Sequence, residues 1–257
     1  GANISILVPI RLAEIYKRSL LNCKVYSDEE FRKKALPAET FDYQSPLGSI
    51  PRYRYKALSD FEDRKFVLKS DKKHRELLKK RYLQQSKSQK KIIGISWQGG
   101  GTKDRINDKS APLNKLLEKL KPYDLTIVSL QYGDDREIVK RHASTYKLDF
   151  IDDEEIQATK DMNSWLNQVD TCDAVISIAN TTIHGAGGLR KPTLCLLGVK
   201  ADWRWLKARS CRKSYWYPTV DVAWQAEDRS WDAALDEIEP WLKKNKLIDK
   251  DGRGRLK

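Results

Sequence analysis

Short apolar runs alternate with amphipathic stretches over most of the second half of the chain. Runs of strand type are predicted at residues 92–97, 125–131, 150–151, 174–178 and 193–197. The spacing of apolar residues predicts helices between them at 112–120, 134–146 and 162–169, with Ser110 and Pro112 at the start of the first. Repeated strand–helix units of this length are typical of a doubly wound parallel sheet. We therefore predict a Rossmann-like α/β domain.

The first third of the chain is less regular. Two short strands are predicted at residues 4–8 and 23–26, on either side of a helix over 11–21. Two prolines and a glycine at residues 41–51 indicate a loop. A basic helix follows at 71–84, with Ser70 as its cap and an apolar stripe of Leu77, Leu78, Tyr82 and Leu83.

These patterns divide the chain into three parts. Because residues 84–91 are polar, basic and without periodicity, they favour a linker. We expect a partial N-terminal α/β domain at residues 1–88, a C-terminal Rossmann-like domain at 89–229, and a C-terminal helix with a tail at 230–257. The helix is predicted over 231–245, after Ser230.

The charge of the chain is uneven. The net charge is +13, and residues 1–90 hold 21 Lys and Arg against 11 Asp and Glu. Such a basic segment could favour nucleic acid, anionic lipid or a phosphorylated ligand. Six of these basic residues lie in one predicted helix, residues 71–84, where acidic residues are interleaved with them, so a solvated surface explains them best. No motif supports nucleic-acid binding.

Other features exclude several classes of protein. No apolar run approaches the ~20 residues that a membrane-spanning helix needs, and no signal peptide is predicted. The four cysteines form no C-x-x-C pair, and the three histidines are far apart in the sequence. We expect a reducing, cytoplasmic location and no metal site.

One stretch of the second half carries the clearest chemical signal. The apolar run at 174–179 stops at Asn180, Thr181 and Thr182. Each of the three can cap a helix, whose free N–H groups would form an anion site at the carboxyl edge of the sheet. His184 lies about one helical turn past Asn180 and could share that site. From these residues alone, a packing turn with a structural histidine is the alternative.

A second strand end is rich in glycine. Ser96 is followed by Trp97, Gln98, Gly99, Gly100, Gly101 and Thr102, and then by the cations Lys103, Arg105 and Lys109. Consecutive backbone N–H groups and nearby cations suit phosphate oxygens. The pattern is neither G-x-G-x-x-G opening into a helix nor a P-loop, which disfavours a nicotinamide-type site. A mobile surface loop is the alternative.

A third strand end carries Gln131 and Tyr132, with Glu137 one turn into the next helix. Tyr132 can stack on a base, and Glu137 can accept hydrogen bonds from ribose hydroxyls. Glu137 as an exposed helical residue is the alternative. Two aromatic segments, 202–205 and 215–218, indicate core packing, a domain interface, or the lining of an acceptor or base pocket.

Six short motifs follow one another in order along the chain. They are ISWQGG at 95–100, KSAPL at 109–113, SLQYG at 129–133, ANTTIHGAG at 179–187, DWRW at 202–205 and WYP at 216–218. Together they resemble glycosyltransferase family 9, the heptosyltransferase-like proteins, especially the bacterial branch often fused to tetratricopeptide repeats. The resemblance spans about residues 41–240, and residues 41–51 resemble the end of that family's N-terminal domain.

The resemblance implies a GT-B fold, in which two Rossmann-like domains face a cleft. It also implies metal-independent transfer with no cofactor, and a nucleotide-diphosphate sugar held by the C-terminal domain. Tyr132 and Glu137 would lie near the nucleoside, with Gln131 also on the donor side. The diphosphate would be held by Trp97, Gln98, Gly99, Gly100, Lys109, Ser110, Asn180, Thr181, Thr182 and His184.

The chain departs from the family pattern at two places. Ala179 stands where the family commonly has an aspartate, so one contact to the donor would be missing. The chain also starts at what resembles a later strand of the N-terminal domain, so that domain is expected to be incomplete. Family members usually take the catalytic base from the earlier part. Asp42 is the nearest carboxylate in a loop, and we do not assign the base to it.

The sequence thus predicts a GT-B glycosyltransferase, in part or whole, in which an acceptor hydroxyl attacks the anomeric carbon and the diphosphate leaves. The acceptor could be a glycan, a lipid-linked molecule or a protein. Three other functions stay open. They are a non-catalytic nucleotide-sugar or glycan-binding module, a sugar-nucleotide epimerase, and a basic nucleic-acid-binding protein.

Overall fold

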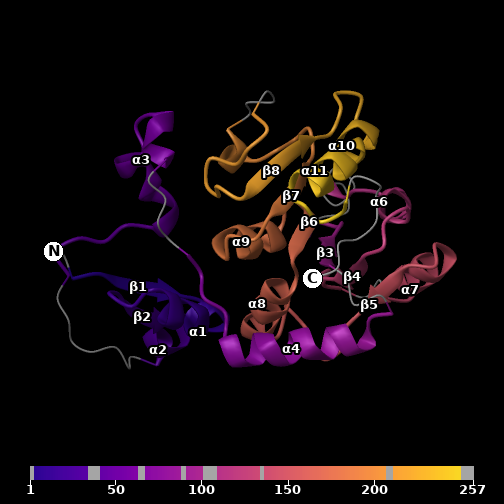
Figure 1. Cartoon of the computed structure of the whole chain (residues 1–257). Coiled ribbons are helices and arrows are strands. Elements are labelled where there is room, and N and C mark those ends of the chain that lie inside the picture. The colour runs from indigo at the N-terminus through magenta and orange to yellow at the C-terminus, as the bar shows by residue number, and fades with distance from the viewer. Residues whose placement is uncertain are drawn as a thin grey trace. The chain divides into compact units, whose positions relative to one another are not determined.

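The computed structural model describes residues 3–33, 41–62, 67–87, 91–100, 109–133, 136–206 and 211–249. The chain forms two compact units, Gly1–Lys69 and Ser70–Lys257 (Figure 1). The division therefore precedes α4 (Lys72–Gln85), and not residue 89 as the sequence suggested. The reason is that α4 packs on α8 (Met162–Thr171), which belongs to the second unit.

The first unit contains a small β–α–β arrangement. Strand β1 (Ser5–Val8) pairs in parallel with β2 (Lys24–Ser27), and α1 (Ile10–Ser19) connects them. Val8, Ala13 and Val25 form the buried centre of this arrangement. The remaining short helices of the unit are α2 (Asp28–Arg32), η1 (Leu47–Ser49), α3 (Pro51–Arg54) and η2 (Leu58–Phe61).

The second unit is built on a six-stranded parallel sheet with the order β5-β4-β3-β6-β7-β8. The strands are β3 (Ile92–Ser96), β4 (Thr126–Ser129), β5 (Asp149–Ile151), β6 (Ala174–Ile178), β7 (Thr193–Leu197) and β8 (Val220–Trp224). The chain builds outward from β3 in one direction and from β6 in the other. This is the doubly wound Rossmann order, and the direction reverses between β3 and β6.

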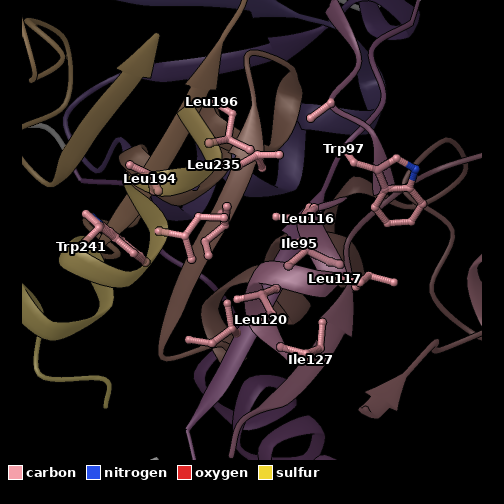
Figure 2. Packing of buried hydrophobic residues seen from close by; sticks show 14 of the residues in the cluster. Ile95, Trp97, Leu116, Leu117, Leu120, Ile127, Leu194, Leu196, Leu235 and Trp241 are labelled. Atoms are coloured by element: carbon pink, nitrogen blue, oxygen red, sulfur yellow. The ribbon is translucent and has the colours of Figure 1, made fainter. Parts of the chain in front are cut away.

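Helices cover both faces of this sheet. They are α6 (Leu113–Leu120), α7 (Arg136–Thr145), α9 (Thr181–Gly188), α10 (Asp232–Asp236) and α11 (Ile238–Lys244), with a short turn η3 (Trp203–Trp205), besides α4 and α8. Side chains of α6, α10 and α11 pack with strand residues into the main core (Figure 2). Every residue of β3, β4, β6 and β7 is buried, as expected for parallel strands covered on both faces.

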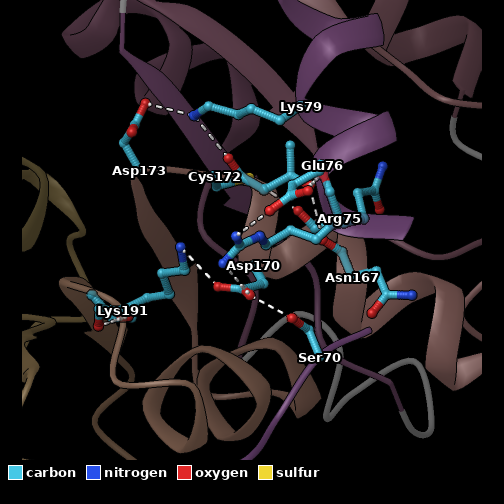
Figure 3. Close-up of polar contacts among 12 residues, drawn as sticks. Ser70, Arg75, Glu76, Lys79, Asn167, Asp170, Cys172, Asp173 and Lys191 are labelled. Atoms are coloured by element: carbon cyan, nitrogen blue, oxygen red, sulfur yellow. Dashed lines mark hydrogen bonds and ion pairs between the residues drawn. The ribbon is translucent and has the colours of Figure 1, made fainter. Parts of the chain in front are cut away.

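Ion pairs and hydrogen bonds hold α4 on the second unit (Figure 3). The carboxylate of Asp170 accepts a hydrogen bond from the Ser70 hydroxyl at 2.5 Å and pairs with Lys191 at 2.9 Å and Arg75 at 3.4 Å. Burial alone would raise the pKa of Asp170, but the Ser70 hydroxyl and the two cations outweigh it and hold the pKa below its usual value. This cluster therefore stabilises the docked helix only while Asp170 is ionised.

Helix ends differ from the predictions at several points. The cap of α4 is Asp71, whose carboxylate accepts from the His74 amide, because the Ser70 hydroxyl is committed to Asp170. The helix predicted over 231–245 is two short helices, α10 and α11. They pack in the main core and do not form a separate part. No helix among the described ranges is long and apolar enough to cross a membrane.

Candidate functional site

Three loops leave the sheet side by side at its carboxyl edge. They follow β4, β3 and β6, which are neighbours in the sheet. The loops after β3 and β6 flank the point where the strand order reverses. In open α/β sheets this is where ligands bind, because the loops on either side diverge and leave a crevice. The three strand ends singled out in the sequence therefore lie together.

The carboxamide of Gln131 ties the loop after β4 to the loop after β3. Its Oε1 accepts hydrogen bonds from the Ser96 hydroxyl at 3.0 Å, the Trp97 amide at 3.1 Å and the Gln98 amide at 3.0 Å. Its Nε2 donates to the carbonyl of Gln98 at 3.2 Å and to that of Tyr132 at 3.1 Å. Gln131 thus sets the course of the glycine-rich loop.

Asn180 makes the matching connection from the loop after β6. Its Oδ1 accepts from the Thr182 amide at 2.9 Å, which makes it the cap of α9. Its Nδ2 donates to the Ser96 hydroxyl at 2.7 Å and to the Gln98 carbonyl at 3.3 Å. Since the Ser96 hydroxyl donates in turn to Gln131, one chain of hydrogen bonds runs across all three strand ends.

The two glycines of the loop lie against candidate site residues. A Cβ atom on Gly99 would stand 3.3 Å from Cβ of Lys109, so the lysine stem passes over this glycine. A Cβ atom on Gly100 would stand 3.0 Å from the hydroxyl of Tyr132. The amide of Gly99 donates to the Ser110 hydroxyl at 3.4 Å. Lys109, Ser110 and Tyr132 are therefore gathered around the glycine-rich loop.

The structure corrects one part of the predicted anion site. The amides of Trp97 and Gln98 are engaged by Gln131, and the amide of Gly99 by Ser110, so these N–H groups are already occupied by protein atoms. The Ser110 hydroxyl accepts this bond, whereas α6 begins at Leu113 with Pro112 as its N-cap residue and has no side-chain cap. The Thr182 amide is likewise taken by Asn180.

Two backbone amides at the edge stay available. Within the described ranges, neither the Gly100 amide nor the Thr181 amide has a hydrogen-bond partner. Thr181 is exposed in the first turn of α9, where helix N–H groups have no partner within the helix. The hydroxyl of Thr182 is buried and also lacks a partner among the described residues. Among the described residues, the free amides of this edge are thus those of Gly100 and Thr181.

His184 lies in the same helix and contacts the segment before β8. Its Nδ1 is 3.0 Å from the hydroxyl of Tyr217. Burial lowers the pKa of His184, the positive charge of Arg204 lowers it further, and Asp202 acts in the opposite direction. The imidazole is therefore neutral near pH 7, with Nδ1 held by a tyrosine hydroxyl. If that hydroxyl donates to Nδ1, the ring carries its proton on Nε2 and can donate to an oxygen.

Tyr217 is itself fixed against α9. A Cβ atom on Gly187 would stand 2.4 Å from Cγ of the Tyr217 ring, so the ring lies directly on the helix backbone. The hydroxyl of Ser214 accepts from the Tyr217 amide at 3.2 Å. Only a glycine at position 187 allows this approach.

The aromatic segments between β7 and β8 have two environments. Trp205 is buried in a second core cluster with Ile183 of α9, which fits the packing interpretation. The rings of Trp203 and Trp216 meet edge to face on the surface, with their centroids 6.0 Å apart. The guanidinium of Arg204 lies over the Trp203 ring. The surface pair leaves the interpretation as a ligand-facing wall open.

Some predicted residues are not joined to the cluster. Glu137 is exposed in the first turn of α7, and none of the hydrogen bonds described above reaches it. The exposed-helix alternative therefore fits it. Gly101, Thr102, Lys103 and Arg105 lie outside the described residues. The described ranges contain no group of three His, Cys, Asp or Glu side chains that could hold a metal ion.

Two residues of the cluster did not stand out in the sequence. Ser96 is fully buried and joins Gln131 to Asn180. The sequence signal that could have indicated this role is a serine at the end of an otherwise apolar strand. Tyr217 belongs to a segment that we interpreted as core packing, a domain interface or the lining of a pocket, and its partner His184 is 33 positions away.

Comparison with known proteins bears on the fold. No protein-family model matches the chain, and no curated protein sequence matches it. A solved glycosyl transferase family 9 structure from Veillonella parvula is similar over 70% of this chain and 53% of its own, with 10% identity and a TM-score of 0.51. The chain thus spans about half the length of that structure.

A second solved structure is covered almost completely. The ADP-heptose LPS heptosyltransferase II of E. coli is similar over 96% of this chain and 91% of its own, with 13% identity and a TM-score of 0.60. At such low identity the likeness concerns the fold. The strand order and the match together show that this chain has a GT-B-like α/β fold similar to that of these glycosyltransferases.

Proposed function

We propose that this protein is a glycosyltransferase that binds a nucleotide-diphosphate sugar at the carboxyl edge of its six-stranded sheet. The observation that carries the proposal is the single hydrogen-bonded network through Gln131, Ser96 and Asn180, which joins three loops at the reversal of strand order. The GT-B-like fold supports the same class of reaction. The structure of the sheet edge suits a ligand that carries a diphosphate.

Within this proposal the residues have different tasks. Gln131 and Asn180 keep the loops in place, because their carboxamide groups form hydrogen bonds within the protein. Lys109 and the amides of Gly100 and Thr181 would hold the diphosphate. Fixed N–H groups and a cation stabilise the negative charge that grows on the leaving diphosphate, without reorganising during the reaction.

Two aromatic or heterocyclic side chains complete the proposed site. His184 would donate its Nε2 proton to a diphosphate oxygen, and Tyr132 would stack on the nucleoside. The acceptor hydroxyl attacks the anomeric carbon, the bond from that carbon to the diphosphate breaks, and the hydroxyl proton passes to solvent or to a general base that we do not assign. No metal ion is assigned a part in this step. A cytoplasmic location is also part of the proposal.

Calorimetry with the diphosphates of uridine, adenosine, guanosine and cytidine tests the proposal. We expect saturable binding of one of them by the full chain. His184→Ala and Lys109→Ala should each weaken it about tenfold, the value of one charge-assisted or buried hydrogen bond. His142→Ala, on α7, is the matched control and should leave the affinity unchanged.

The outcomes separate the proposal from its rivals. If none of the four diphosphates binds, the donor site is wrong. Binding without transfer from any sugar nucleotide points to a non-catalytic module, and interconversion of free sugar nucleotides points to an epimerase. Binding to duplex DNA that weakens steeply with salt would instead favour nucleic acid as the partner.

A further inference from the structure

The short turn η3 presents one exposed indole on the surface of the second unit. Trp203 is 52% exposed, whereas five of the eight tryptophans in the chain are at most 7% exposed and the other two are half-buried. Tryptophan is highly buried on average, because its ring carries a large apolar area. A single exposed apolar side chain is nevertheless ordinary on a protein surface, so the case for a ligand depends on what surrounds this ring.

The backbone that carries Trp203 is fixed from several sides. The carboxylate of Asp202 accepts a hydrogen bond from the Arg204 amide at 2.9 Å. The indole Nε1 of Trp216 donates to the Arg204 carbonyl at 2.7 Å. Trp205, two residues further along, is buried in a core cluster of the second unit. The exposed ring therefore stands on a frame that is already ordered, and a ligand would not need to order it on binding.

An acidic and a basic side chain flank the exposed ring. The guanidinium carbon of Arg204 lies 4.6 Å from the centroid of the Trp203 ring, and Arg204 pairs with Asp202 at 3.3 Å. Both charged side chains are nearly half exposed. A carboxylate accepts hydrogen bonds and a guanidinium donates them, while the pair as a whole carries no net charge. These groups suit a neutral ligand that has hydroxyl groups. We call Asp202, Trp203, Arg204 and Trp216 the tryptophan corner.

The tryptophan corner borders the candidate donor site. The turn η3 follows β7, which pairs in parallel with β6, the strand before α9. Trp216 directly precedes Tyr217, whose hydroxyl is 3.0 Å from Nδ1 of His184. The acidic and the basic side chain of the corner both act on the pKa of this imidazole, in opposite directions. In a nucleotide sugar the sugar is attached to the diphosphate, so a diphosphate beside His184 would carry its sugar next to the corner.

We propose that the tryptophan corner is the subsite for the sugar of the nucleotide-diphosphate sugar. The C–H groups of the sugar ring pack on the exposed part of the Trp203 indole, because their partial positive charge is attracted to the negative face of the aromatic system. Asp202 accepts hydrogen bonds from the sugar hydroxyls, and Arg204 donates to them. The inference rests on the proposed function and adds to it the class of the transferred sugar, which is a neutral one.

Calorimetry of the full chain compares each of the four nucleoside diphosphates with its sugar esters. The neutral sugars are glucose, galactose and N-acetylglucosamine, and the charged one is glucuronic acid. We expect at least one neutral ester to bind about tenfold more tightly than its parent diphosphate, a gain of the size that stacking one ring on an aromatic side chain gives. The glucuronic acid ester should not bind more tightly than the glucose ester.

Variants of the corner assign this gain. Trp203→Ala should abolish it and leave the affinity for the nucleoside diphosphate unchanged, whereas Trp203→Phe, which keeps an aromatic face, should retain part of it. Leu77→Ala is the matched control, because it removes a side chain of α4 that is 60% exposed, and it should leave both affinities unchanged. Thermal unfolding shows whether each variant is folded. If Trp203→Ala is not, Asp202→Asn decides, since it keeps an acceptor for the Arg204 amide and should reduce the gain.

Three results would overturn the inference. The first is that no neutral ester binds more tightly than its diphosphate, and the second is that Trp203→Ala, or Asp202→Asn in its place, keeps the full gain. The third is a preference for the glucuronic acid ester, which would contradict a neutral sugar. In all three cases the nucleoside diphosphate still binds, so the proposed donor site stands and this inference alone fails. If neither a diphosphate nor an ester binds, the proposed function and the inference both fail.

Discussion

Gly187→Ala tests whether the contact between α9 and Tyr217 is as tight as the structure shows. The new Cβ atom would stand 2.4 Å from Cγ, 2.7 Å from Cδ1 and 2.9 Å from Cβ of Tyr217. Because the Tyr217 Cβ is attached to the backbone, the segment before β8 or the helix itself must shift. Overpacking of this kind costs about 1–3 kcal/mol. The gain in helix propensity from glycine to alanine is about 1 kcal/mol, so we expect a net loss of up to about 2 kcal/mol.

Tryptophan fluorescence in urea measures this loss in the correct part of the protein. All eight tryptophans lie after residue 70, so the signal reports on the second unit alone. A matching fall of the melting temperature by up to about 8 °C is expected for a unit of this size. Gly48→Ala, where an added Cβ meets nothing within 4 Å, is the control by circular dichroism. Gly187→Ala should also weaken nucleoside-diphosphate binding, because Tyr217 moves away from His184.

A double-mutant cycle decides between this explanation and a general effect on the helix. In a Tyr217→Ala background the ring contacts are gone, so Gly187→Ala should cost at least about 1 kcal/mol less than in the wild type. The reasoning is refuted if Gly187→Ala costs the same in both backgrounds. It is also refuted if the single variant is as stable as the wild type and binds the diphosphate equally well.

Three further predictions follow from the polar clusters. Asp170→Asn should lower the free energy of unfolding by about 1–3 kcal/mol at pH 7. Since the folded-state pKa of Asp170 is depressed, this stabilisation is present above its unfolded pKa and is lost as the pH falls through the folded pKa. Urea titrations should therefore show that the difference in the free energy of unfolding between variant and wild type disappears in acid. Gln131→Leu leaves the amides of Trp97 and Gln98 without an acceptor and should lower the free energy of unfolding by about 2 kcal/mol. Gln131→Glu retains an acceptor and should lower it less. Equal losses of stability in urea unfolding would contradict this. NMR should show the imidazole of His184 titrating below its usual pKa, and a pKa at or above the usual value would disprove the burial. Because the folded-state pKa is depressed, the unfolded state binds more protons as the pH falls from 7 to 5, and the free energy of unfolding decreases. This decrease should be smaller in His184→Gln.

The strands of the second unit were largely predictable from local pattern. Strands β3, β6 and β7 are continuous apolar runs because both their faces are buried, and the predicted ranges match them within about one residue. Strand β8 was missed. It lies at the edge of the sheet, and Asp221 interrupts its apolar run to accept from the indole of Trp241 at 3.1 Å. Edge strands carry polar residues that weaken the signal.

The boundary between the units shows why the sequence placed α4 in the first unit and the structure places it in the second. The composition of residues 84–91 resembles a linker, yet Ser86 is buried and its hydroxyl lies 2.6 Å from that of Thr126. A short polar residue can serve a loop or a buried hydrogen bond equally well, and only its neighbours in space distinguish the two. The lysines and arginines of α4 are similar, since Lys79 pairs with Asp173 at 3.2 Å instead of facing solvent.

The sequence by itself determined the order of strands and helices, the positions of the glycine-rich loop and the cap of α9, and the set of residues that could meet a diphosphate. Those features depend on interactions within a few residues, which a linear pattern records. Only the tertiary structure decided that Gln131 takes the amides of Trp97 and Gln98, and that Tyr217 holds His184. These pairs are brought together by the strand order and by helix packing. The local sequence around a hydrogen-bonding group does not indicate which distant residue will bond to it.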